Sequence, residues 1–166
     1  MDAVRAVRLL QFHVTPSPDA IVVVKDSDND DTRRAALGEL HNHVAADRTP
    51  VVIGVPHTEI ECWLLAGFVV QPGSEEQRYG SLFGELSFCP VKQSERLTGS
   101  KGPDARDPKR VLRVLTDSNE SRVWECVETP FPTLTQNGLN NGLGAFLDDI
   151  QKRLLRSLYG GSPSTT

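Results

Sequence analysis

Two aspartates in this sequence follow a short apolar segment, and their spacing suits the binding of a metal ion. The segment is Ile21–Val24, four β-branched residues in a row, and Lys25 separates it from Asp26 and Asp28. Such a run is typical of a strand that is buried on both faces of a sheet. Alternation along an extended chain would place both carboxylates on one side, with Cα atoms roughly 6.6 Å apart. Oxygen ligands of this kind suit Mg²⁺, which binds through one or two carboxylates plus substrate phosphates.

The same acidic stretch also has a plainer interpretation, because residues 26–31 would equally suit a solvated turn that caps the next helix. The residues alone leave both interpretations open. Burial separates them: we expect the side chains of residues 21–24 to be buried, and exposure would remove the argument for the sheet-edge position. That position matters because the carboxyl edge of a sheet is where open α/β folds usually place their active sites.

A second acidic pair follows a second apolar segment. Residues 51–55 predict another buried strand, and Glu59 and Glu61 come soon after it. A right-handed crossover through one helix would bring both acidic pairs to the same edge of the sheet. Residues two apart in a helix do not share a face, so one glutamate would point toward the aspartates, while Glu61 also suits a capping box with Thr58. Four acids at one edge would repel each other without a cation, which favours a metal site.

The only strongly basic part of this acidic chain is residues 92–113. This segment has seven basic and three acidic residues, a local charge of +4 in a chain of net charge −4. Asp107 followed by Pro108 predicts a helix start, whose free amides would attract anions. The alternative is a solvated loop and helix face. We expect nucleic-acid phosphates to contact four side chains here: Lys101, Arg106, Lys109 and Arg110.

Helices and strands alternate in the first half of the chain. We expect a helix over residues 3–12, a strand over 20–25, a helix from Asp31 or Thr32 to about 46, the strand 51–55 and a helix to about 66. This order predicts an α/β fold with parallel strands. The second half predicts a helix over 74–86 broken by glycines, a mobile loop over 92–106, a helix from 108, a loop over 129–142 and a closing helix to 158.

Composition limits the class of protein. The chain has 166 residues, which suits one domain over residues 1–158, with a disordered tail over 159–166. Its three widely spaced cysteines are typical of reduced thiols and not of a disulfide framework or zinc site. With no long apolar run, the sequence predicts a cytoplasmic protein without a membrane partner.

At this point the motifs resemble a family. An apolar strand that ends in D-x-D, followed by a strand and an E-I-E-x-W-L-L segment, is similar to the Toprim-like bacterial proteins catalogued as a domain of unknown function. The matching stretches are residues 22–28 and residues 52–66, which include Glu59, Glu61 and Trp63. The Asp107-Pro108-Lys109 helix start and the late helix that contains Phe146 also correspond in position, so the resemblance covers most of the chain.

The resemblance implies a three-layer α/β Toprim-like domain with a small, mostly parallel sheet, related to the overcoming-lysogenisation-defect nucleases. It implies Mg²⁺ or Mn²⁺ at Asp26 and Asp28, with Glu61 or Glu59 in a catalytic role. The implied function is phosphodiester chemistry on nucleic acid, with DNA expected, as a nuclease or nuclease subunit in anti-phage defence. An ATPase or another protein subunit, or further copies of the chain, are the expected partners.

One part of the family pattern is absent, namely a first strand that ends in a catalytic glutamate. No acidic residue follows a strand before Asp19. Three explanations stay open: a shortened or misassigned start, a glutamate from another chain, or a site that has lost catalysis. The last two lead to the alternative function, a non-catalytic binding or assembly subunit with a degenerate or shared site.

Overall fold

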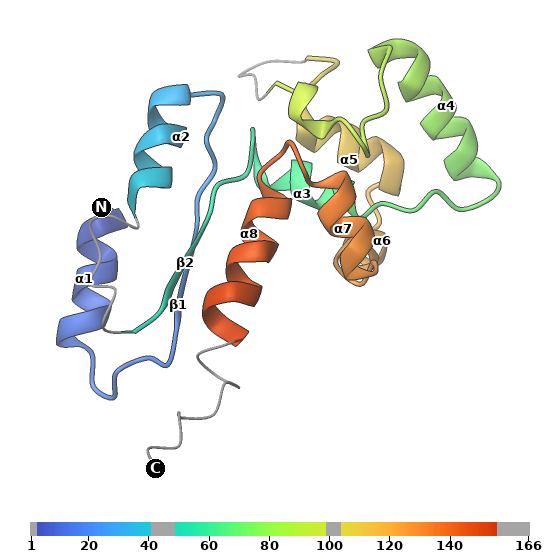
Figure 1. Cartoon of the computed structure of the whole chain (residues 1–166). Coiled ribbons are helices and arrows are strands. Elements are labelled where there is room, and N and C mark those ends of the chain that lie inside the picture. The colour runs from blue at the N-terminus through green and yellow to red at the C-terminus, as the bar shows by residue number, and fades with distance from the viewer. Residues whose placement is uncertain (1–2, 41–48, 99–103, 156–166) are drawn as a thin grey trace.

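The computed structural model describes residues 3–40, 49–98 and 104–155 and shows a mixed α/β fold around a parallel pair of strands (Figure 1). Strand β1 (Ile21–Val24) pairs with β2 (Val51–Gly54), with Ile21 level with Val51. Helix α2 (Asp31–Gly38) lies between them in the chain. The predicted α/β class with parallel strands is therefore confirmed. Asp30, and not Asp31 or Thr32, caps α2, because its side chain accepts a hydrogen bond from the Arg33 amide.

Helices cover the two faces of the strand pair (Figure 1). On one side, α1 (Ala3–His13) and the residues after α2 contribute Val7 and Leu40, which pack with Ile21 and Ile53. On the other side, α8 (Leu143–Asp149) packs against β2 and continues into the π-helical turn η3 (Ile150–Leu155). The strands thus form the middle layer of the N-terminal half.

Burial differs sharply between the two strands. All four residues of β2 are buried, whereas Val22 and Val24 of β1 are 51% and 44% exposed. The expectation that residues 21–24 are buried on both faces is therefore wrong for half of the strand. The physical reason is that α8 covers β2 but not β1, and the described residues contain no strand beyond β1.

The remaining helices form a second cluster around their own apolar core. They are α3 (Ile60–Ala66), α4 (Ser74–Leu86), the 3-10 turn η2 (Ser94–Arg96), α5 (Pro108–Thr116), α6 (Glu120–Val127) and α7 (Phe131–Asn137). Leu65, Leu97, Val111 and Leu115 are fully buried there. The predicted start of α5 is confirmed, since the Asp107 side chain accepts from the Lys109 amide and Pro108 is the first helical residue.

Several predictions for the second half are wrong. Helix α4 is unbroken, because Gly80 and Gly84 face open space and leave the helical hydrogen bonds intact. Helix α7 occupies part of the predicted loop 129–142, since a helix tolerates proline in its first turn. Within the predicted mobile loop 92–106, Ser94 and Leu97 are buried in the core. The predicted tail lies outside the described residues.

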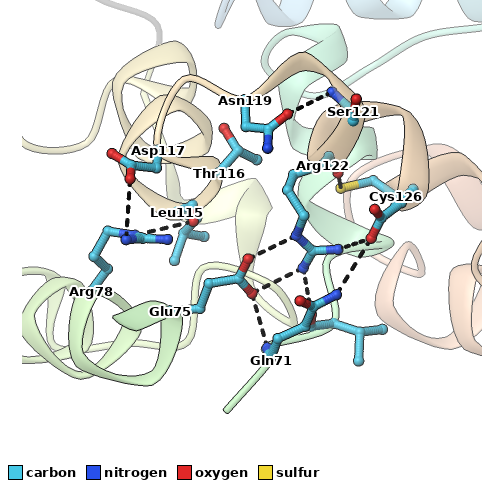
Figure 2. A network of polar contacts seen from close by, with 12 residues as sticks. Gln71, Glu75, Arg78, Leu115, Thr116, Asp117, Asn119, Ser121, Arg122 and Cys126 are labelled. Atoms are coloured by element: carbon cyan, nitrogen blue, oxygen red, sulfur yellow. Dashed lines mark hydrogen bonds and ion pairs between the residues drawn. The ribbon is translucent and has the colours of Figure 1, made fainter. Parts of the chain in front are cut away.

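A buried polar network joins α4 to α6 (Figure 2). The Arg122 guanidinium donates to both carboxylate oxygens of Glu75, at 2.7 and 2.9 Å, and to the Val69 carbonyl at 3.0 Å. Glu125 forms an ion pair with the same guanidinium, and the backbone N–H of Gln71 donates to Glu75 Oε2 at 2.9 Å. These contacts fix the polar side of the helical cluster, away from the strands.

No helix in the described part of the chain is both long enough and apolar enough to span a membrane.

Candidate active site at the carboxyl edge of the sheet

Backbone pairing continues past the ends of both strands and brings the acidic segments side by side. The amides of Lys25, Ser27 and Asp28 donate to the carbonyls of Gly54, Pro56 and Thr58, at 3.0, 3.1 and 3.0 Å respectively. Asp26 is consequently level with the start of the segment that leads to Glu59. Hydrogen bonds, and not burial of β1, hold this aspartate at the carboxyl edge of the sheet.

Asp26 lies at the centre of the acidic edge. Burial raises the pKa of its carboxyl group, and the nearby carboxylates of Asp28 and Glu59 raise it further. A hydrogen bond from the Ile60 backbone and the charge of Lys109 act in the opposite direction and lower this pKa. Because the Ile60 amide opens α3, the aspartate contacts the N-terminal end of that helix. Asp26 is thus a partly desolvated carboxylate among like charges.

Asp28 does not extend the row of carboxylates as alternation predicted. Its φ of 50° and that of Asn29, 59°, are left-handed, so the extended conformation ends before Asp28. Asp and Asn tolerate this conformation, and here the turn leads directly to the helix cap at Asp30. The Asp28 carboxylate is about half exposed and forms an ion pair with Arg33 of α2. Asp26 thus lies at the predicted edge of the sheet, whereas residues 28–30 form the predicted turn that caps the next helix.

Glu61 is the second partly buried carboxylate at this edge. Burial raises its pKa, Lys109 lowers it, and Glu59 and Asp26 raise it again. Its Oε2 atom is buried and has no hydrogen-bond partner among the described residues. The predicted capping box with Thr58 is wrong, because the Thr58 hydroxyl donates to the Leu97 carbonyl at 2.8 Å. A hydrogen bond from its own backbone amide lowers the pKa of Glu61, so only the Oε2 atom is left without a partner among the described residues.

Lys109 supplies the positive charge closest to these acids. Its ammonium lies 3.0 Å from Glu59 Oε2, and the Glu59 side chain is only 14% exposed. This contact with Glu59 raises the pKa of Lys109. The start of α5 thus lies against the start of α3, with Lys109 beside the acidic edge.

The other basic residues predicted to bind phosphate lie in different settings. Arg110 donates to both carboxylate oxygens of Glu85, each at 3.0 Å, and therefore faces α4. Arg106 is exposed, with its guanidinium 5.8 Å from the centroid of the Phe88 ring. Lys101 lies outside the described residues. Of the four predicted contacts, the structure brings only Lys109 against the acids.

Sequence reasoning missed Asn141, a fully buried residue behind the edge. Its carbonyl accepts from the His57 amide at 2.9 Å and from the Trp63 indole at 2.8 Å. Its side-chain amide donates to the Cys62 carbonyl and to Ser94 Oγ, both at 2.8 Å. Asn141 thus ties the C-terminal third of the chain to the segment that carries Glu59 and Glu61. An Asn-Asn-Gly sequence indicates a turn but not this role.

His57 and Ser27 lie together on the α2 side of the edge, with the Ser27 hydroxyl 3.4 Å from His57 Nδ1. Burial lowers the pKa of His57, and Arg34 lowers it further, while Asp31 and Glu95 raise it. Across residues 3–40, 49–98 and 104–155, no three His, Cys, Asp or Glu side chains form a group that could enclose a metal ion. A divalent cation here would have one or two carboxylate ligands and would need further oxygen atoms from a substrate or water.

Comparisons with protein-family models, curated proteins and solved structures found no match to this chain.

Proposed function

We propose that this chain supports Mg²⁺- or Mn²⁺-dependent phosphodiester chemistry on nucleic acid, as a nuclease or as the nuclease subunit of a larger assembly. The observation that carries the proposal is the raised pKa of two carboxylates, Asp26 and Glu61, which share one edge with Glu59. Partly desolvated acids close together are costly unless a cation balances them, and such groups cluster at functional sites. The resemblance described above adds the Toprim-like three-layer fold and the anti-phage context to this proposal.

The residues present fit a hard divalent cation. Glu61 Oε2 is a buried oxygen without a hydrogen-bond partner, and Asp26 is a second partly buried carboxylate near it. Asp26, with Asp28 or Glu61, would hold the ion, which when bound polarises the phosphate and lowers the pKa of a coordinated water. Release of Asp28 from Arg33 would be required for its participation.

The protein's own groups have separate roles in this proposal. A glutamate with a raised pKa is a better proton acceptor near neutral pH than an ordinary one, so we assign the general base to Glu61, with Glu59 as the alternative. Lys109 would exchange its contact with Glu59 for a substrate phosphate, and the exposed Arg106 would extend the contact along the strand. Lys101 is proposed as a phosphate contact from its position in the sequence alone. Arg110 could contact phosphate only after its ion pair with Glu85 breaks.

The test compares cleavage of plasmid and linear DNA in Mg²⁺ or Mn²⁺ by the wild type, by Asp26→Ala/Asp28→Ala and by a control, Asp148→Ala. Asp148 is an exposed aspartate near the end of α8, and it forms an ion pair with Lys152 of η3. We expect cleavage by the wild type and the control only. Equal cleavage by all three proteins would remove Asp26 and Asp28 from the mechanism.

The second candidate function is a non-catalytic binding or assembly subunit with a degenerate or shared site. Two ion pairs favour it, Lys109 with Glu59 and Arg33 with Asp28, because they neutralise acidic charge within the chain. Calorimetric titration with Mg²⁺ in the presence of a non-hydrolysable oligonucleotide separates the two functions. Heat of Mg²⁺ binding that disappears in Asp26→Ala supports the enzyme, and its absence in the wild type supports the subunit.

A further inference from the structure

Strand β1 presents an open edge to solvent. The amides of Ile21 and Lys25 donate toward β2, so the alternate residues Val22 and Val24 direct their backbone N–H and C=O groups away from it. Within the described residues these groups have no backbone partner. Unpaired groups along a strand edge are a template for pairing with another strand.

Two of the four side chains of β1 are apolar and exposed, Val22 at 51% and Val24 at 44%. The residues before the strand carry four more exposed apolar side chains, Leu9, Leu10, Phe12 and Val14. Exposed apolar side chains on an open strand mark an interaction surface. None of the four residues of β1 is a proline or carries a charge, and Lys25, which could protect the edge, follows the strand directly.

A second copy of the chain complements this surface by charge. Asp19 lies just before β1 and Lys25 just after it; both are exposed, and neither forms an ion pair within the described residues. In an antiparallel pair of identical strands, the start of one strand lies beside the end of the other. With Val22 opposite Val24, each Lys25 lies opposite Ile21 of the other copy and diagonal to its Asp19, about 7–8 Å away, which the long lysine side chain can span; the two-fold symmetry repeats this contact.

We propose that two copies of this chain associate through β1, which pairs antiparallel with β1 of the second copy to join both sheets into one of four strands. Centring the two-fold axis on Val23 places Val22 opposite Val24 of the second copy. These are the residues whose backbone groups point outward, so each such pair exchanges two hydrogen bonds.

The interface adjoins the proposed site at one residue, because Asp26 directly follows Lys25. The carboxyl ends of the two β1 strands point in opposite directions, so the two acidic edges lie at opposite ends of the joined sheet. Glu61 and Lys109 belong to α3 and α5 and lie outside the interface. Association is measured without any cleavage assay, so failure of this proposal and failure of the proposed function are distinguishable.

Sedimentation velocity over a wide concentration range tests the interface. We expect a species with twice the 18.2 kDa mass of the chain. Val22→Lys/Val24→Lys places like charges across the edge and is expected to weaken association by about tenfold or more. The matched control is Val69→Lys/Val127→Lys, because these valines are 59% and 52% exposed elsewhere on the surface. A monomeric wild type, or equal weakening by both variants, would overturn the proposal.

Charge reversal tests the antiparallel register without touching the apolar strand. Asp19→Lys alone places two lysines together at each end of the interface and is expected to weaken association by about tenfold, counting both symmetric contacts. Adding Lys25→Asp restores opposite charges and should return the association constant to that of the wild type. Failure of the double reversal to restore association would refute the proposed pairing, even if the valine variant dissociates. Circular dichroism of each variant verifies that the monomer is folded.

Discussion

The Arg122–Glu75 pair allows a quantitative test of what burial adds to an ion pair, because the chain contains a second pair of similar geometry. Arg122 donates to both oxygens of Glu75 between α6 and α4, with side chains 12% and 9% exposed. Arg110 donates to both oxygens of Glu85 between α5 and α4, with side chains 31% and 41% exposed. Each arginine also donates to one backbone carbonyl, of Val69 and of Ala105; the contacts differ in their access to water and in the second acidic partner, Glu125, that Arg122 has.

We expect Arg122→Met to lower the free energy of unfolding by about 3–5 kcal/mol, because it leaves the Glu75 carboxylate buried without its cation. It also removes the donor to the Val69 carbonyl and the guanidinium that lies 5.2 Å from the Phe68 ring centroid. Arg110→Met is the matched control and should cost about 0.2–1 kcal/mol, the value of a solvent-accessible pair. Glu75→Gln/Arg122→Met should be more stable than Arg122→Met alone, since no buried charge is left unpaired.

The assay is urea unfolding followed by circular dichroism at neutral pH and at lower pH. The hydrogen bond from Arg122 lowers the pKa of Glu75 below 4.5, its ordinary value, so this pair contributes stability above pH 4.5. That contribution is lost as the pH falls through the lowered pKa. The difference between wild type and Arg122→Met should therefore shrink in acid. Similar losses for Arg122→Met and Arg110→Met at neutral pH would refute the argument from burial.

Two further predictions concern single residues. Because burial raises the pKa of Glu61 above its ordinary 4.5, the folded protein binds the proton more tightly than the unfolded chain, and stability falls as the pH rises through this interval. Glu61→Gln should therefore unfold at a higher urea concentration than the wild type at neutral pH but not below pH 4.5. The control, Glu128→Gln at an exposed position, should leave the urea midpoint unchanged at both pH values. A lower urea midpoint of Glu61→Gln at neutral pH would contradict this reasoning. Gly142 has φ +89°, and an added Cβ would lie 2.3 Å from the Val55 carbonyl oxygen, so Gly142→Ala should cost at least about 1–3 kcal/mol. Gly80→Ala, which meets nothing within 4 Å in an exposed helix, should instead raise stability by about 1 kcal/mol, and the same sign of change in both variants would refute the steric reasoning.

The parts of the fold that local chemistry dictates could be predicted from the sequence. Four β-branched residues before Asp26, and the similar run from Val51, define two strands, and one intervening helix makes them parallel. Asp107 and Pro108 define a helix start: the aspartate side chain caps the helix, and the proline lacks an N–H group, which the first helical residue does not need. The shared edge of Asp26 with Glu59 and Glu61 follows from that topology.

Features that depend on distant partners could not be predicted. The run of residues 21–24 is equally apolar whether or not a helix covers it, so the exposure of Val22 and Val24 has no local signal. Thr58 and Glu61 have the spacing of a capping box, yet the Thr58 hydroxyl donates its hydrogen bond to the Leu97 carbonyl, 39 positions along the chain. The ion pairs of Lys109 and Arg110 likewise join segments whose proximity only the folded chain defines.

Asn141 links the acidic edge to a residue that the ribosome adds long after the acidic residues themselves. The ribosome makes the chain from its N-terminus, so Asp26, Glu59 and Glu61 have all been added before the residue that holds His57 and Trp63. A nascent chain that stops short of Asn141 carries Asp26, Glu59 and Glu61 but lacks the hydrogen bonds that Asn141 makes with His57 and Trp63. In such a chain only the pairing of the residues after β1 with those after β2 would hold the acidic edge together.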